Sequence, residues 1–209
     1  CVFRETTERK RTERRLAAQH ATTRVLAESV TLSEATPKIL QAICDCLGWE
    51  VGAIWRVDKQ DNLLRCVETW HQPGASVSGF ELRTREITFP PGVGLPGRVW
   101  KSGQAAWIED VTQDSNFPRA PFAAEAGLHG AFGFPILLKD EVVGVIEFFS
   151  SEIRKPDDNL LRMIASIGIQ IGQFIERKRT EEKLMYERYL LESLMDNVPD
   201  AIYFKDERS

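Results

Sequence analysis

Hydrophobic residues follow a helical spacing at both ends of the chain and a strand-like spacing in the middle. Residues 7–29 contain no glycine or proline and carry a thin apolar stripe, which predicts a long helix that needs a partner helix. A second helix is expected to begin at the cap residue Ser33 and to end at Gly48. Serine is a common N-cap residue, and glycine is common directly after a helix end.

The middle of the chain predicts two β-hairpins. Val, Ile and aromatic residues are concentrated in two pairs of segments, and a short polar turn separates the members of each pair. The first pair covers 50–57 and 63–71, and the second covers 130–138 and 142–150. Each pair is therefore expected to form two neighbouring antiparallel strands.

Shorter elements are expected between the two hairpins. The apolar positions Leu82, Ile87 and Phe89 predict a strand over 80–89, which Pro90 ends. The remaining elements are a strand at 105–109 and two short helices at 95–101 and 122–126.

The last helix is expected to begin after Asp157, whose side chain is a good N-cap. Its apolar residues are separated by four and three positions in alternation, which is the heptad spacing of a packed helix seam. These seam residues are Leu160, Ile164, Ile167, Ile171 and Phe174. We expect one continuous helix that packs on the sheet, forms a dimer and signalling seam, and breaks at 197–200 before a new strand at 201–204.

The order of these elements determines the expected fold class. Two helices come first, then strands interrupted by short helices, and then one long helix. This order predicts an α+β fold with a five- or six-stranded, mostly antiparallel sheet and the terminal helices on one face.

Composition excludes several classes of protein. The net charge of −4 argues against a general nucleic-acid-binding protein, which usually carries a concentrated basic surface. No stretch is long and apolar enough to predict a membrane span, and no signal peptide is visible. The four cysteines do not form a disulfide-rich pattern, so a cytoplasmic location is expected. Since the first residue is Cys, we expect the chain to be a segment of a longer protein.

One charged hexapeptide occurs twice. Glu-Arg-Lys-Arg-Thr-Glu stands at 8–13 and again at 176–181, and in both places a leucine follows three residues later. The repeat indicates that the same type of helical junction flanks a folded module. The alternative is two solvated helix turns of similar composition.

Five motifs stand out in the middle of the chain: Pro91–Trp100, Ser102–Gln104, Trp107–Asp110, Gly127–Ile136 and Glu141–Phe149. Together they resemble the GAF domain family, and the resemblance covers residues 20–178. The two chain ends carry other patterns: 4–10 is similar to the end of a PAS domain, and 197–206 is similar to the beginning of another.

The resemblance implies a domain organisation. It comprises the tail of a PAS-like domain at 1–7, a linker helix at 8–30, a GAF domain at 31–175, a signalling-helix linker at 176–197 and the start of a following PAS-like domain at 198–209. The resemblance also implies a pocket on one sheet face, roofed by short helices and loops, and dimerisation through the terminal helices on the other face.

Eight residues are candidates for contact with a small molecule in that pocket. Aromatic side chains with a few polar groups among them are typical of ligand sites. The candidates are Trp55, Trp70, Trp107, Asp110, Arg119, Phe122, His129 and Phe134. Because side chains of a strand alternate between the two faces, about half of the aromatic residues are expected in the core under the terminal helices instead.

Two candidates have a specific chemistry. Arg119 lies in the loop expected to roof the pocket, where an anionic ligand would be its partner; the alternative is a solvated loop arginine. His129 lies at the start of a strand and is a candidate to bind a ligand or haem iron; the alternative is a hydrogen bond to local backbone. The ligand itself stays unknown.

Other known GAF chemistries lack their residues. Covalent bilin attachment usually needs a Cys-His pair, but Leu128 precedes His129. The signature of cyclic-nucleotide GAF domains is also not found. The motif Gly92-Val-Gly-Leu-Pro-Gly97 fits a dinucleotide fingerprint, but Pro90 and Pro91 precede it instead of a buried parallel strand, so a tight turn is expected.

The resemblance therefore implies a non-catalytic sensory module of a bacterial two-component protein, and we expect that protein to be a sensor histidine kinase. It would bind a small molecule and relay a signal through dimerising helices. The alternatives are a relay module without a ligand, and a GAF module of a diguanylate cyclase or phosphodiesterase.

Overall fold

The computed structural model describes residues 2–197. The strand predicted at 201–204 and the PAS-like beginning lie outside the described residues. In chain order the elements are α1 (Val2–Glu28), α2 (Leu32–Leu47), β1 (Val51–Asp58), β2 (Leu63–His71), α3 (Ser78–Glu86), β3 (Thr88–Phe89), α4 (Gly94–Ser102), β4 (Ala106–Ile108), α5 (Ala120–Glu125), β5 (Gly130–Leu138), β6 (Glu141–Ser150) and α6 (Asp158–Asn197).

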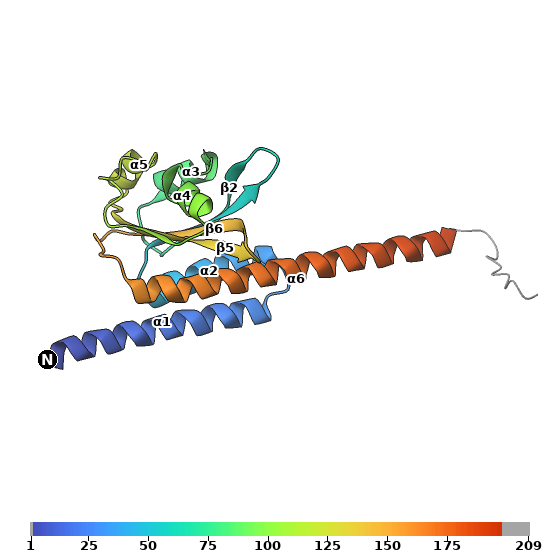
Figure 1. The fold of residues 1–209 in the computed structure, drawn as a ribbon, viewed down its shortest axis with the longest axis horizontal. Helices are drawn as coiled ribbons and strands as arrows, with labels where there is room; N and C mark the ends of the chain where they lie inside the picture. The colour runs from blue at the N-terminus through green and yellow to red at the C-terminus, as the bar shows by residue number, and fades with distance from the viewer. Residues whose placement is uncertain (1, 198–209) are drawn as a thin grey trace, which may run out of the picture.

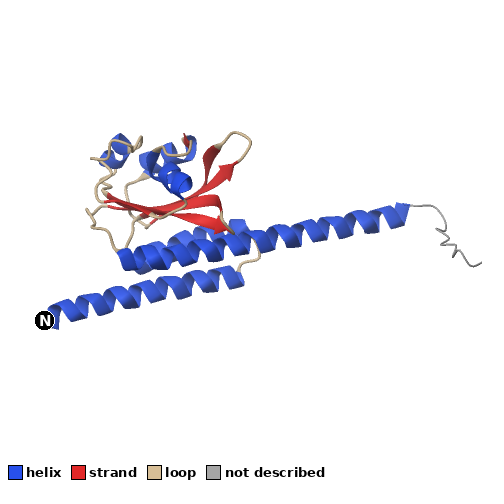
Figure 2. Ribbon diagram, viewed as in Figure 1, coloured by secondary structure: helices blue, strands red, loops and turns tan. Residues whose placement is uncertain are grey.

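A single antiparallel sheet forms the centre of the molecule, with the strand order β3-β2-β1-β6-β5-β4. Strands β1 and β2 form one hairpin and β5 and β6 the other, so both predicted hairpins are confirmed. The short helices α3, α4 and α5 cover one face, and α1, α2 and α6 lie on the other (Figure 2). The fold is α+β with six strands, as the element order predicts.

The prediction of a strand at 80–89 is wrong for most of that segment. Residues 78–86 form helix α3, and only Thr88 and Phe89 pair with β2. Phe80 and Thr84, four residues apart, point into the core, whereas Leu82 is 62% exposed. The buried positions therefore follow the helical period and not the alternation of a strand.

Helix α2 begins two residues earlier than predicted. Its N-cap is Thr31 and not Ser33, because the Thr31 hydroxyl accepts a hydrogen bond of 3.2 Å from the Glu34 backbone N–H. The Glu34 carboxylate in turn accepts from the Val30 N–H at 3.0 Å. Such reciprocal bonds satisfy N–H groups that have no partner within the helix.

The heptad stripe of α6 is buried within the chain itself. Helix α6 packs on β5 and α1, and the stripe joins the core beneath the sheet. Ile164, Ile167 and Ile171 are fully buried. This corrects the expectation that the five stripe residues form the seam between two copies, because their apolar surface is already removed from water by the sheet.

Two glycines allow the close contact between α6 and β5. Gly168 and Gly172 lie one helical turn apart, and a Cβ atom added at either would overlap a backbone carbonyl oxygen, that of Pro135 or of Leu137. A backbone oxygen cannot rotate away as a side chain does. The absence of a side chain at both positions therefore sets the distance between helix and sheet.

Helices α1 and α6 run side by side in the same direction (Figure 1). Polar contacts join them at three levels: Arg15 to Asp157 at 2.5 Å, Thr23 to Gln170 at 3.3 Å, and Arg177 to the Leu26 carbonyl at 3.5 Å. Asp157 also accepts from the Leu160 N–H at 3.0 Å, which confirms it as the cap of α6. The start of α6 is thus bonded directly to α1.

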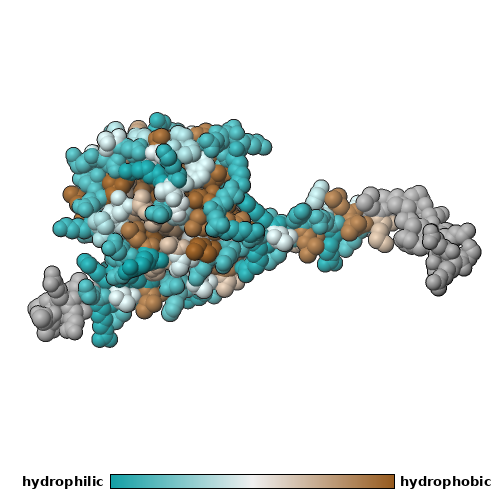
Figure 3. Space-filling model, in the orientation of Figure 1, coloured by the Kyte–Doolittle hydropathy of each residue, from teal (hydrophilic) through white to brown (hydrophobic). Residues whose placement is uncertain are grey.

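Beyond the sheet, α6 continues as one uninterrupted helix that projects from the domain (Figure 1). Apolar residues are exposed on the projecting part, where Figure 3 shows hydrophobic side chains among hydrophilic ones. They include Leu184, Tyr189, Leu191 and Met195. Among the described residues, none of the helices has the length and apolar character required to cross a lipid bilayer.

Candidate functional site

A buried ion pair lies between the sheet and the roof helices. The side chains of Arg119 and Glu147 are both 0% exposed. One terminal nitrogen of Arg119 donates to the two Glu147 oxygens at 2.7 and 2.8 Å, and the other donates to the Thr84 hydroxyl at 2.9 Å. Glu147 also accepts from the Trp55 indole N–H at 2.9 Å.

Five aromatic rings surround the guanidinium group of Arg119. Its central carbon lies 5.1 to 5.4 Å from each ring centroid, within the range of cation–π attraction. The rings belong to Trp55, Phe80, Phe89, Phe117 and Phe149. We call Arg119, Glu147, Thr84 and these five rings the roof core. In this structure side chains of the protein fill it.

Strand alternation places Glu147 in the roof core. Val145, Glu147 and Phe149 of β6 face the roof helices, whereas Ile146 and Phe148 face the terminal helices. Burial raises the pKa of the Glu147 carboxyl, and the Arg119 guanidinium and the Trp55 N–H oppose that rise. Glu147 is the acidic residue within the apolar run 142–149, and this was the sequence signal for the site. The sequence analysis did not include Glu147 among its eight candidates.

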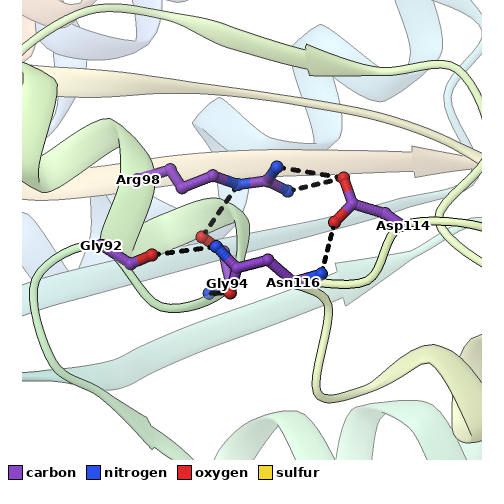
Figure 4. A network of polar contacts seen from close by, with 5 residues as sticks. All are labelled: Gly92, Gly94, Arg98, Asp114 and Asn116. Carbon is purple, nitrogen blue, oxygen red and sulfur yellow. Dashed lines mark hydrogen bonds and ion pairs between the residues drawn. The ribbon is translucent and has the colours of Figure 1, made fainter.

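The loop that carries Arg119 is fastened to the start of α4. Figure 4 shows the Arg98 guanidinium facing the Asp114 carboxylate. Both terminal nitrogens of Arg98 donate to the same carboxylate oxygen of Asp114, Oδ2, at 3.0 Å. Asn116 accepts from the Gly94 N–H at 3.0 Å and donates to the Gly92 carbonyl at 2.9 Å. These bonds hold residues 110–119 over the sheet and so direct Arg119 inward.

The same contacts explain the glycine motif at 92–97. The Gly92 N–H donates to the Gly97 carbonyl at 2.7 Å and closes a tight turn. Asn116 already accepts from the first N–H of α4. The motif is therefore a tight turn, as expected, and it binds Asn116 of the loop 110–119. It is not a phosphate-binding loop.

The structure separates the eight sequence candidates. Trp55, Arg119 and Phe122 lie on the roof side of the sheet. The central carbon of the Arg83 guanidinium lies 5.5 Å from the centroid of the Phe122 ring. On the other face, Phe134 is buried in the core under the terminal helices, and the side chains of Trp70 and Trp107 pack against that core. Only part of the set can therefore contact one ligand.

Asp110 and His129 form a partly exposed pair. The His129 Nδ1 lies 3.0 Å from an Asp110 oxygen, which also accepts from the backbone and hydroxyl of Thr112 at 3.0 and 2.7 Å. Partial burial opposes ionisation of Asp110, but the bonds from Thr112 and His129 outweigh it and hold its pKa below the ordinary value. The backbone of His129 pairs with Val111 and Ser150. These contacts position the loop at the start of β5.

Arg119 does not have the role that the sequence suggested. Its charge is paired with Glu147, so neither an anionic ligand nor solvent is its partner in this structure. An open hollow of about 480 Å³ lies elsewhere, at the tips of the two hairpins. Two of its lining residues, Lys59 and Glu141, form an ion pair with each other at 2.7 Å.

The GAF domain family matches residues 29–176, which is most of the chain. The chain belongs to the GAF domain family. Solved GAF domains share the fold. The A. Aeolicus nlh2 GAF domain in an inactive state has a TM-score of 0.64 and 21% identity, over 80% of this chain and 98% of that one. The GAF domain of a phosphoenolpyruvate-protein phosphotransferase (ptsP) from Coxiella burnetii has a TM-score of 0.68 and 17% identity, over 82% and 98%.

A domain of a putative two-component sensor histidine kinase from Sinorhizobium meliloti 1021 is also similar, with a TM-score of 0.58 and 19% identity over 75% of this chain and 99% of that one. Among plant proteins, transcription factor MYC1 of Arabidopsis thaliana is 30% identical over 117 residues, 54% of this chain and 21% of its own length. The chain spans less than a quarter of the length of the plant relatives it matches.

Proposed function

We propose that this GAF domain is a regulatory module that relays a conformational signal from α1 to the projecting part of α6. The observation that carries the proposal is the continuity of α6, which packs on β5 and then leaves the domain as the same helix. A rigid helix transmits a rotation or shift at one end to its other end. The three polar contacts between α1 and α6 support the coupling of these two helices.

A contiguous set of contacts joins the roof core to α6. Glu147 lies opposite Gly133 in the pairing of β6 with β5. Two residues further along β5, the carbonyl of Pro135 faces Gly168 of α6. A change in the roof core that moves β5 would therefore move the helix.

The larger protein is proposed to be a bacterial multi-sensor histidine kinase with PAS-like domains on both sides of residues 31–175. The resemblance of 4–10 and 197–206 to PAS sequences supports this, and so does the fold shared with the Sinorhizobium domain. Residues 31–175 supply no catalytic group in the proposal, and the phosphorylated histidine belongs to another domain. A diguanylate cyclase or phosphodiesterase output is the alternative.

The filled roof core favours a relay state without a bound small molecule. Five rings and one ion pair occupy the space between sheet and roof. Native mass spectrometry of the purified protein separates the two versions of the proposal, because a retained adduct favours ligand binding. The unmodified mass favours the relay without a ligand.

Insertions into the projecting helix test the relay. Two or seven helix-forming residues are inserted between Glu182 and Lys183 of the full-length protein. Seven residues restore nearly the same helical phase, whereas two rotate everything downstream by roughly half a turn. The seven-residue insertion is expected to keep the output within about twofold of the parent, and the two-residue insertion to change it about tenfold, because a rigid rod transmits phase.

The output is measured as ATP-dependent autophosphorylation, with synthesis and breakdown of cyclic diguanylate followed in parallel for the alternative. Control insertions of both lengths go into the β1–β2 turn, at Asp61, which does not lie between α1 and the projecting helix. Equal outputs from the two helix insertions would contradict the relay.

The projecting part of α6 is also the proposed dimer contact, because the earlier stripe is buried. Leu184 and Leu191 are seven residues apart and 59% and 61% exposed, as expected for a seam that a second copy covers. Changing both to Glu is expected to convert the dimer to a monomer, since four carboxylates would meet in the seam. Sedimentation or light scattering gives the mass.

Tyr189→Glu is the matched control for this substitution. Tyr189 is also exposed, but it lies five residues from Leu184 and two from Leu191, so it points to another side of the helix. It should leave the dimer intact. An unchanged dimer mass in the Leu184→Glu/Leu191→Glu protein would refute a seam at these residues.

A further inference from the structure

The roof core has the chemistry of a receptor for a planar cation. Both Glu147 oxygens and the Thr84 hydroxyl accept hydrogen bonds in directions that match the forked guanidinium group. The surrounding rings present their faces to the positive charge, an arrangement that proteins use to recognise organic cations. A buried carboxylate disfavours any anion at this place.

The parts of this receptor belong to different elements of the fold. Glu147 and Phe149 are on β6, Trp55 is on β1, and Phe80 is on α3. Arg119 comes instead from the loop before α5, together with Phe117. The cation is therefore supplied by a loop, while the carboxylate that holds it belongs to the central sheet.

The Arg119 guanidinium is not fully satisfied in its position. Its Nε is buried and has no hydrogen-bond partner, although its two terminal nitrogens are bonded. The loop that carries it is held by Asp114 and Asn116, whose contacts with α4 are only partly buried. Loss of those contacts would release Arg119 while leaving Glu147 and most of the rings in place.

We propose that the roof core is a binding site for small guanidinium or amidinium compounds, and that Arg119 is its internal occupant. A free cation of this class competes with Arg119 for Glu147, and its binding displaces the loop 110–119. The proposal names the ligand class of the regulatory module, and only its effect on output rests on the proposed relay.

The test uses Arg119→Ala, which empties the guanidinium position. N-ethylguanidinium is compared with N-ethylurea, a neutral compound of almost the same shape. The cation is expected to bind saturably by calorimetry and to raise the Tm of the variant by about 4 °C at ten times its Kd. N-ethylurea should raise it by less than about 1 °C. The wild-type protein should bind the cation more weakly than the variant does, because the cation must first displace Arg119, and it should not bind N-ethylurea.

Arg119→Ala/Glu147→Gln is the matched control, because it keeps the cavity and removes the charge. It should lose the preference for the cation. Equal responses to the cation and the urea in Arg119→Ala, or a preference that persists in the double variant, would overturn the proposal. Binding is measured on the domain alone, so failure here is distinguishable from failure of the helix insertions.

A second variant applies if Arg119→Ala does not fold. Asp114→Ala/Asn116→Ala keeps the arginine and removes the bonds that fasten its loop. N-ethylguanidinium should then increase amide hydrogen exchange at 112–121 at least threefold and saturably, and N-ethylurea should not. No difference between the two compounds would overturn the proposal.

Discussion

Replacing Arg119 by methionine is expected to lower the free energy of unfolding by about 4 kcal/mol at neutral pH. Methionine is similar in length and fills the same space, so the main loss is the partner of Glu147. A buried carboxylate without a counter-charge is one of the most destabilising features in a protein. Urea denaturation monitored by tryptophan fluorescence measures the change, since Trp55 lies in the roof core.

The destabilisation should depend on pH. Burial already raises the pKa of Glu147 above its ordinary value of 4.5, and loss of Arg119 removes the main opposing interaction. The folded variant therefore binds a proton more tightly than the unfolded chain does. Below pH 4.5 both states are protonated and the penalty is small; it grows as the pH rises from 4.5 toward the folded-state pKa. The neighbouring Cys66 thiol stays neutral over this range because burial raises its pKa to about 12.

The double variant Arg119→Met/Glu147→Gln is the control. It removes both charges and keeps an oxygen that accepts from the Trp55 N–H. Most of the lost stability should return, because replacing a whole buried pair costs far less than breaking it. The interpretation is wrong if Arg119→Met loses the same stability at pH 4.5 and pH 8, or if the double variant is less stable than the single one.

Replacing Gly172 by alanine is expected to lower the free energy of unfolding by about 3 kcal/mol and the Tm by about 9 °C. The new methyl group would overlap the Leu137 carbonyl, so α6 must move away from β5 or the strand must bend. Intrinsic helix propensity alone predicts the opposite sign, because alanine favours a helix over glycine. Thermal unfolding by circular dichroism decides between the two effects.

Gly79→Ala is the matched control for this substitution. Gly79 also lies in a helix, α3, but a Cβ atom there meets no atom within 4 Å. It should be neutral or stabilising by up to about 1 kcal/mol. A Gly172→Ala protein as stable as the parent would show that α6 is not held closely on β5, which would also weaken the proposed relay.

Local sequence patterns determined most of the elements. The runs of Val, Ile and aromatic residues in the hairpins, the cap at Asp157 and the heptad stripe of α6 are properties of neighbouring residues, and backbone geometry converts them directly into strands and helices. The strand predicted at 80–89 failed because only a few apolar positions supported it. Burial of Phe80 and Thr84 under the roof decided in favour of a helix.

Tertiary structure decided what each face of these elements contacts. The sequence showed that α6 has an apolar seam, but only the packed sheet showed that β5 and α1 cover it. Arg119 and Glu147 are 28 residues apart in the sequence, and no pattern of neighbouring residues indicates that they are in contact. Their contact depends on a loop fastened by Asp114 and on the register of a central strand. Interactions between distant segments arise from packing, which no short window of sequence contains.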